Sequence, residues 1–118
     1  MKPLLWVGQS KKDFLAFPEE VHDAVGYALH RAQLGGKHSS AKPLKGFKGG
    51  GVLEVVEDHD GDTYRAVYTV RFASAVYVLH AFQKKSRKGI ATPKQEIDLV
   101  QRRLLIAETD NAERTKET

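Results

Sequence analysis

Four basic or titratable side chains between residues 65 and 85 have types that suit chemistry on a phosphate. Arg65 and His80 lie in β-rich runs, and Lys84 and Lys85 follow the second of these runs. Cleavage at a phosphate requires a proton acceptor, a proton donor and cations for the charge that develops. An arginine fork can hold two phosphate oxygens, and a histidine can transfer protons near neutral pH. We therefore predict Arg65, His80, Lys84 and Lys85 as candidate catalytic residues.

The same residues also have structural interpretations. Arg65 could form a salt bridge with Glu54, a diagonal neighbour on one face of a predicted hairpin. A single histidine within a strand more often makes structural hydrogen bonds than it carries out catalysis. A lysine pair at the end of a strand is often a solvated charge run. The sequence leaves the functional and structural interpretations open.

Positive charge is concentrated in the middle of the chain. Residues 31–93 carry eleven Lys/Arg against five Asp/Glu, whereas residues 1–30 carry three against four and residues 94–118 five against six. Such a concentration favours binding to a polyanion such as nucleic acid. The candidate RNA-binding residues in this segment are Lys45, Lys48, Arg71, Arg87 and Lys88.

Metal and cofactor sites are not predicted. The chain has no cysteine, which excludes disulfides and thiolate ligands and is typical of a cytoplasmic protein. His22 and His30 lack an accompanying set of acidic residues, and the glycine-rich segment 37–51 lacks the closing Gly-Lys-Ser/Thr of a phosphate-binding loop. The apolar run within residues 1–8 is too short for a signal peptide or a membrane span. We expect a cytoplasmic location without membrane association.

The first half of the chain predicts a strand followed by two helices. Lys2–Val7 predicts a short buried strand, and Ser10 is a suitable cap for a first helix. Pro18 suits the first turn of a second helix, whose apolar stripe ends at the glycine pair 35–36. The basic segment 37–51 is then either a loop whose lysines approach phosphates or a flexible connector.

A β-hairpin is predicted around the dipeptide Asp60-Gly61, which is typical of tight two-residue turns. The flanking strands are Val52–Asp58 and Thr63–Phe72, and the turn places Val56 opposite Arg65. Alternation then assigns one face to the core: Leu53, Val55, Ala66, Tyr68 and Val70. The opposite face is the predicted working face: Val52, Glu54, Val56, Arg65, Val67, Thr69 and Arg71.

The last third of the chain predicts one strand and one helix. Ala75–Gln83 is apolar in both alternating sets, which is typical of a strand covered on both sides. Thr92, Pro93 and Gln95 form a helix start, with a cap, a first-position proline and a capping-box glutamine. The apolar stripe of this helix ends near Glu108.

The element order defines the fold class. Residues 1–108 are predicted to form a single α+β domain, and the polar residues 109–118 a frayed tail. The N-terminal strand and the helical pair should pack on a mainly antiparallel sheet, in the order β-α-α-β-β-β-α.

Two segments resemble toxins of the RelE/ParE superfamily. Tyr64-Arg65-Ala66-Val67-Tyr68 resembles their Tyr-Arg-x-x-Tyr segment, and Leu79–Lys85 followed by Thr92-Pro93 is similar to the phage-derived, HigB-like branch. Together with the element order, the resemblance covers nearly the whole chain. It implies a small RelE/ParE-like fold and a cognate antitoxin. In the nuclease branch it also implies cleavage of ribosome-bound messenger RNA without a metal or another cofactor, carried out by basic residues of the sheet.

The chain departs from the nuclease members at one strand. Those members have lysines on the strand before the Tyr-Arg segment, whereas this strand has Glu54 and Glu57, and the lysines lie earlier, at Lys42, Lys45 and Lys48. Two alternatives therefore stand beside the nuclease interpretation: an interaction toxin of the gyrase-inhibiting kind and a plain RNA-binding domain. An antitoxin is expected to present carboxylates and an apolar element to the face of Arg65, Lys84 and Lys85 or to a neighbouring helix.

Overall fold

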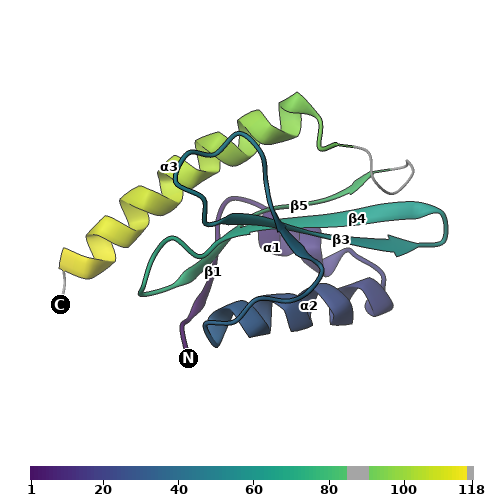
Figure 1. Cartoon of the computed structure of the whole chain (residues 1–118), viewed down its shortest axis with the longest axis horizontal. Helices are drawn as coiled ribbons and strands as arrows, with labels where there is room; N and C mark the ends of the chain where they lie inside the picture. The colour runs from purple at the N-terminus through teal and green to yellow at the C-terminus, as the bar shows by residue number, and fades with distance from the viewer. Residues whose placement is uncertain (85–90, 117–118) are drawn as a thin grey trace.

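A five-stranded sheet with helices on both faces forms the body of the computed structural model, which describes residues 1–84 and 91–116 (Figure 1). The strand order is β1-β5-β4-β3-β2, with β1 parallel to β5 and the remaining pairs antiparallel. The predicted α+β class and the mainly antiparallel sheet are confirmed. The elements are β1 (Leu4–Trp6), α1 (Ser10–Leu15), α2 (Glu19–Gln33), β2 (Ala41–Pro43), β3 (Val52–His59), β4 (Asp62–Thr69), β5 (Val76–Lys84) and α3 (Lys94–Lys116).

The two edges of the sheet differ from the expectation. β2 is a strand that the sequence did not predict, because three residues ending in proline show neither alternation nor length. It forms by pairing with β3, with Ala41 opposite Val55 and Lys42 opposite Glu54. β1 was predicted to be buried, but its residues are half-buried because it is the other edge strand.

The hairpin between β3 and β4 has the predicted register, with Val56 opposite Arg65. Asp60 and Gly61 have φ values of 50° and 84°, as a two-residue hairpin turn requires. β4 ends at Thr69 rather than at the predicted Phe72. Beyond Thr69, the Val70 N–H donates to the Gly51 carbonyl at 2.8 Å, outside the regular ladder.

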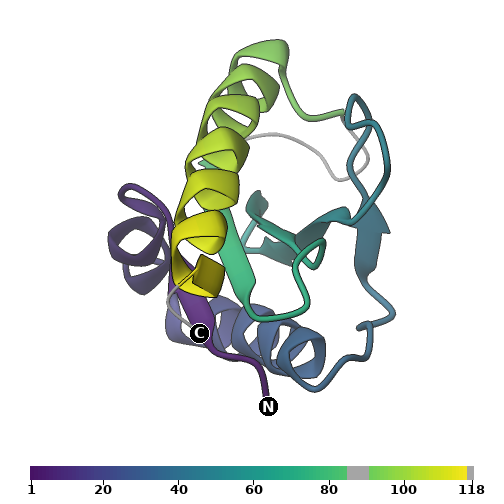
Figure 2. The ribbon, with the colours of Figure 1, turned by 90° about the vertical axis from the view of Figure 1, so that its left-hand side faces the viewer.

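Two apolar clusters lie on opposite faces of the sheet. The first contains the predicted core face together with α1 and α2 (Figures 1 and 2). The second lies under α3 and includes Val52, Val67, Tyr77, Leu79, Val100, Leu104 and Ala107. α3 therefore covers the predicted working face. The physical reason is that Val52, Val67 and the second apolar set of β5 need a cover, and the stripe of α3 supplies it.

Both predicted hydroxyl caps have partners far away in the sequence. Ser10 Oγ donates to the Val78 carbonyl oxygen at 3.0 Å, in a fully buried position. Thr92 Oγ1 donates to a Glu54 carboxylate oxygen at 2.5 Å. The first turn of α3 is instead closed at Pro93. The Pro93 carbonyl oxygen accepts hydrogen bonds from two backbone N–H groups of this turn, at 3.0 and 3.1 Å.

The predicted frayed tail is helical as far as Lys116. Tyr77 Oη donates to Asp110 Oδ2 at 2.5 Å, and Arg114 Nε donates to the same oxygen at 2.7 Å. Ser74 Oγ adds a 2.7 Å bond to Asn111. The contacts of Asp110 with Tyr77 of β5 and of Asn111 with Ser74 hold the last turns of α3 against the body of the protein. None of the described helices is long and apolar enough to cross a membrane.

The two most deeply buried tyrosines make stability depend on alkaline pH. Burial raises the pKa of Tyr68 to about 12, and burial together with the Asp110 hydrogen bond raises the pKa of Tyr77 to about 12. The unfolded chain loses these protons near pH 10. The stabilisation is therefore complete below about pH 10 and is lost as pH rises towards 12.

We expect the free energy of unfolding, measured with urea, to fall between pH 9 and about pH 11. In Tyr77→Phe this fall should be smaller by about 1 kcal/mol, because one proton fewer is linked to unfolding. Comparison with the wild type at each pH cancels the contribution of the lysines. An equal fall in both proteins would contradict the link to Tyr77.

Candidate functional site

The sheet register brings polar side chains together on the face under α3. Glu54 of β3 lies opposite Lys42 of β2 on one side and Val67 of β4 on the other, and Val67 lies opposite His80 of β5. Paired and alternate residues share a face. The polar residues that share this end of the face are Lys42, Glu54, Arg65, His80 and Lys84.

Arg65 is buried and ion-paired. Its side chain is only 3% exposed, and Nη1 lies 3.5 Å from Glu54 Oε1. Nη1 also donates to Thr92 Oγ1 at 3.0 Å, and the Thr92 hydroxyl donates in turn to Glu54. The salt bridge with Glu54, which the sequence offered as the structural interpretation of Arg65, is thus present. Thr92, two residues before α3, contacts both members of this ion pair.

His80, a residue of β5, contacts two side chains of α3. Its side chain is 7% exposed, and Nε2 lies in hydrogen-bond contact with Glu96 Oε2. Nδ1 lies 3.4 Å from Arg103 Nη1, which also donates to the Leu79 carbonyl at 2.9 Å. A guanidinium can only donate, so Nδ1 is the acceptor and Nε2 carries the proton towards Glu96. The Phe82 ring stacks on the imidazole with centroids 4.7 Å apart.

We call this set, in which Arg65 and His80 are buried and the others partly buried, the polar seam: Glu54, Arg65, His80, Thr92, Glu96 and Arg103. It combines two guanidinium groups with a histidine–carboxylate pair, the residue types that bind phosphate and transfer protons. Sequence reasoning missed Glu96 and Arg103. The available signal was their spacing, because positions 96, 100, 103 and 107 share one helical face with the apolar stripe.

The basic end of β5 is described only in part. Lys84 is half-buried, and its carbonyl accepts a 3.1 Å hydrogen bond from Thr63 Oγ1. Lys84 lies opposite Thr63 in the register and so shares the face of Arg65, as predicted. The other predicted residues of this run, Lys85, Arg87 and Lys88, lie outside the described residues.

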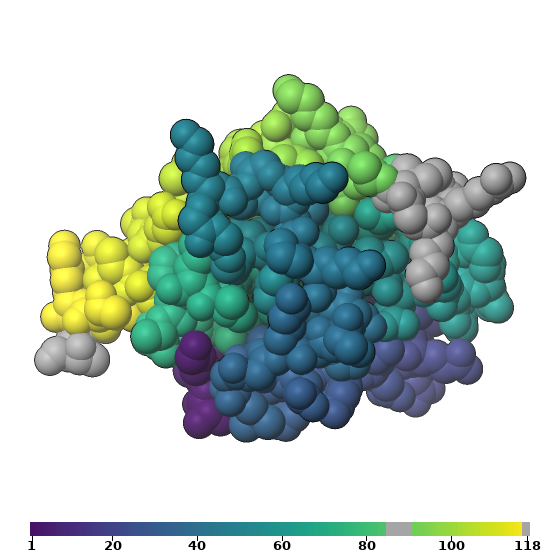
Figure 3. Space-filling view, in the orientation of Figure 1, coloured from purple at the N-terminus to yellow at the C-terminus, as the bar shows by residue number. Residues whose placement is uncertain are grey.

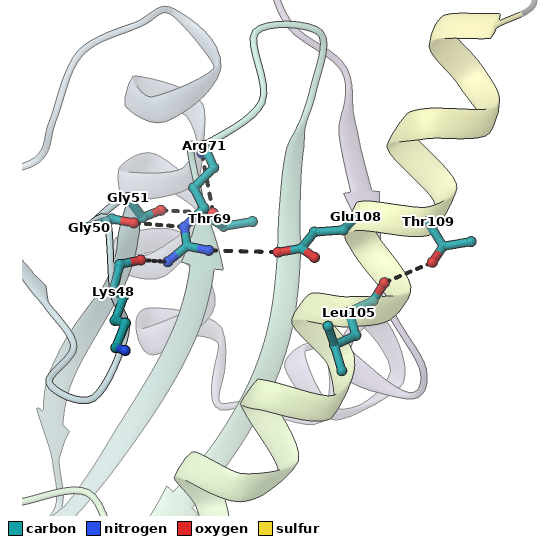
Figure 4. Close-up of polar contacts among 8 residues, drawn as sticks. All are labelled: Lys48, Gly50, Gly51, Thr69, Arg71, Leu105, Glu108 and Thr109. Atoms are coloured by element: carbon teal, nitrogen blue, oxygen red, sulfur yellow. Dashed lines mark hydrogen bonds and ion pairs between the residues drawn. The ribbon is translucent and has the colours of Figure 1, made fainter.

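Arg71 connects the glycine-rich loop to α3 (Figure 4). Its Nε donates to the Gly50 carbonyl at 2.8 Å, Nη2 donates to the Lys48 carbonyl, and Nη1 lies 3.7 Å from Glu108 Oε1. Thr69 Oγ1 adds a 2.8 Å bond to the Gly51 carbonyl. The guanidinium that was predicted to bind RNA thus makes three contacts within the chain and fixes the loop.

Segment 37–51 exposes its lysines. Leu44 and Phe47 pack against the apolar cluster under α3, while the side chains of Lys45 and Lys48 are exposed. Figure 3 shows this segment on the surface, with side chains projecting from the molecule. Lys45 and Lys48 are therefore accessible to a phosphate backbone. Within residues 1–84 and 91–116, no group of three or more His, Asp or Glu converges as a metal site does.

Comparison with known proteins identifies one family. The family model described as "Phage derived protein Gp49-like" matches residues 12–105. This range contains the glycine-rich loop, the three long strands and every residue of the polar seam. No curated protein matches the chain.

The burial of Arg65 predicts its effect on stability. Arg65→Ala leaves the Glu54 carboxylate without its cation in a low-dielectric site, which should cost about 3–5 kcal/mol in the free energy of unfolding. The double variant Glu54→Leu with Arg65→Met removes both charges and should recover most of this loss. Urea unfolding measures both. A loss below about 1 kcal/mol in Arg65→Ala would mean that the guanidinium is solvated.

Two glycines of the loop provide a matched comparison. Gly49 and Gly51 have φ values of +85° and +76°, so alanine strains the backbone at both. A Cβ at Gly51 would lie 2.7 Å from Arg71 Cγ, whereas a Cβ at Gly49 meets nothing within 4 Å. Gly49→Ala should cost about 1 kcal/mol and Gly51→Ala about 1–3 kcal/mol more, measured by urea unfolding. Equal losses would show that Arg71 does not fix the loop.

Proposed function

The chain belongs to the phage-derived Gp49-like family of RelE/toxin-like proteins, and on this premise we propose that it is the toxin of a type II toxin–antitoxin pair. Its proposed activity is metal-free cleavage of ribosome-bound messenger RNA, as in the HigB-like branch. The observation that carries the proposal is the set of Lys42, Arg65, His80 and Lys84 on one end of one sheet face.

The chemistry requires four events at one phosphate. The 2′-oxygen forms a bond to phosphorus, its proton leaves, the bond to the 5′-oxygen breaks, and that oxygen gains a proton. His80 exchanges protons in this scheme: it takes the proton of the 2′-hydroxyl and returns one to the leaving 5′-oxygen. Glu96 holds the imidazole only while the first turn of α3 covers the sheet. Arg65, Lys42 and Lys84 stabilise the charge that develops on the phosphate oxygens.

β2 supports the nuclease interpretation. β3 carries Glu54 and Glu57. The nuclease members of the RelE/ParE superfamily, which the chain resembles, have lysines on the corresponding strand. Lys42 on β2 lies opposite Glu54 and so brings an exposed lysine to the same face. A neighbouring strand thereby supplies the charge that β3 lacks.

RNA reaches the polar seam when the first turns of α3 move off the sheet. Thr92 and Glu96 bind these turns to Glu54 and His80. The far half of α3 has its own contact, from Tyr77 to Asp110. The start of the helix can therefore open while its end stays bound. In the structure, Thr92 and the first turn of α3 cover the polar seam.

One observation favours a second candidate, the non-catalytic interaction toxin. Arg65 is committed to a buried ion pair, as a purely structural arginine would be. A toxin of this kind would arrest growth through a protein target without cutting transcripts. Such a toxin would stay active when Lys42, His80 or Lys84 is replaced, provided that the fold is intact.

Expression in a bacterial host with mapping of transcript ends separates the candidates. The wild type should arrest growth and produce new transcript ends, and Lys42→Ala with Lys84→Ala should reduce cleavage at least about tenfold by removing charge stabilisation. Lys11→Ala with Lys12→Ala, an exposed pair on α1, makes the same change in net charge and should leave cleavage intact.

The outcomes of this experiment differ between candidates. Growth arrest without new transcript ends, retained in Lys42→Ala with Lys84→Ala, would replace the nuclease with the interaction toxin. Absence of arrest by the wild type would favour the plain RNA-binding domain. Co-expression of the neighbouring gene should restore growth if it encodes the antitoxin.

A further inference from the structure

The side of α3 that faces away from the sheet carries an exposed apolar pair. Leu105 is 63% exposed and Ile106 57% exposed, whereas the residues that pack on the sheet, Val100, Leu104 and Ala107, are buried. Figures 1 and 2 show α3 on the outside of the molecule, with its C-terminal end extending beyond the strands. These two adjacent aliphatic side chains form a small apolar patch on an otherwise polar helix surface.

Charged residues flank this pair in a definite order. Asp98 and Arg102 precede it, and Glu113 and Lys116 follow it. Arg102, Ile106, Thr109 and Glu113 are spaced by four, three and four residues, so they lie along one face of the helix. Among the described residues, no salt bridge engages Arg102, Glu113 or Lys116, and Asp98 pairs only with the exposed Lys94 at 3.6 Å.

The order of charges is complementary to itself. Along the outer face it runs acidic, basic, apolar, acidic, basic. In an antiparallel pair about a two-fold axis between residues 107 and 108, Arg102 lies directly opposite Glu113 of the second copy. Asp98 lies one residue out of register with Lys116 of the second copy. A parallel pair would instead place like charges opposite one another.

We propose that two copies of this chain associate through the outer face of α3 as an antiparallel helix pair. Leu105 and Ile106 of both copies form its apolar centre, and each charge pair occurs twice by symmetry. The order of charges makes this face complementary to the same face of a second copy, and only in the antiparallel direction. This face points away from the polar seam, so the proposal is independent of the proposed activity.

Sedimentation equilibrium from about 1 to about 300 µM tests the association. A contact built on four aliphatic side chains and exposed ion pairs should dissociate in the micromolar range. Arg102→Glu should raise the dissociation constant at least about tenfold, because it replaces two attractive pairs with two repulsive ones. Glu113→Arg should have the same effect. Both residues are exposed, so both variants should keep the wild-type melting temperature.

Two recovery experiments exclude indirect effects. The double variant Arg102→Glu with Glu113→Arg reverses both charges and should dimerise as the wild type does. A mixture of the two single variants should form a heterodimer, because each supplies the charges that the other lacks. A wild type that stays monomeric at about 300 µM, or a double variant that stays monomeric, would overturn the proposal and leave this face to a partner of different sequence.

Discussion

The packing of α3 on the second face of the sheet is the contact on which the other features depend. Val100, Leu104 and Ala107 are buried against Val52 and Leu79, side chains that the strands would otherwise expose to water. This contact turns a sheet with one covered face into a three-layer structure. It also brings Glu96 and Arg103 over His80, and Glu108 within reach of Arg71.

Because α3 covers this face of the sheet, the polar side chains beneath it lose contact with water and need partners within the protein. In a low-dielectric site an unpaired charge is costly, so each member of the polar seam has a partner on a different element. Arg65 pairs across the hairpin with Glu54, and His80 pairs across the layers with Glu96. The seam therefore holds two guanidinium groups and a histidine–carboxylate pair in contact with one another under α3.

The two halves of α3 differ in what holds them. The first turns meet the sheet through the polar pairs of Thr92 and Glu96, whereas the later turns combine Leu104 and Ala107 with the Tyr77 contact. Polar contacts exchange readily for contacts with water or phosphate, but apolar burial has no such substitute. This difference is the physical basis for the opening that we propose at the start of the helix. The outer face of the later turns remains available for association.

The sequence by itself determined the elements that depend on local pattern. The hairpin register follows from Asp60-Gly61 and alternation, and the burial of β5 follows from its two apolar sets, so both were predictable. Tertiary structure decided the rest, because no local pattern encodes a long-range partner. It decided that α3 covers the face of Arg65, that β2 pairs with β3, and that Thr92 binds Glu54 rather than capping its own helix.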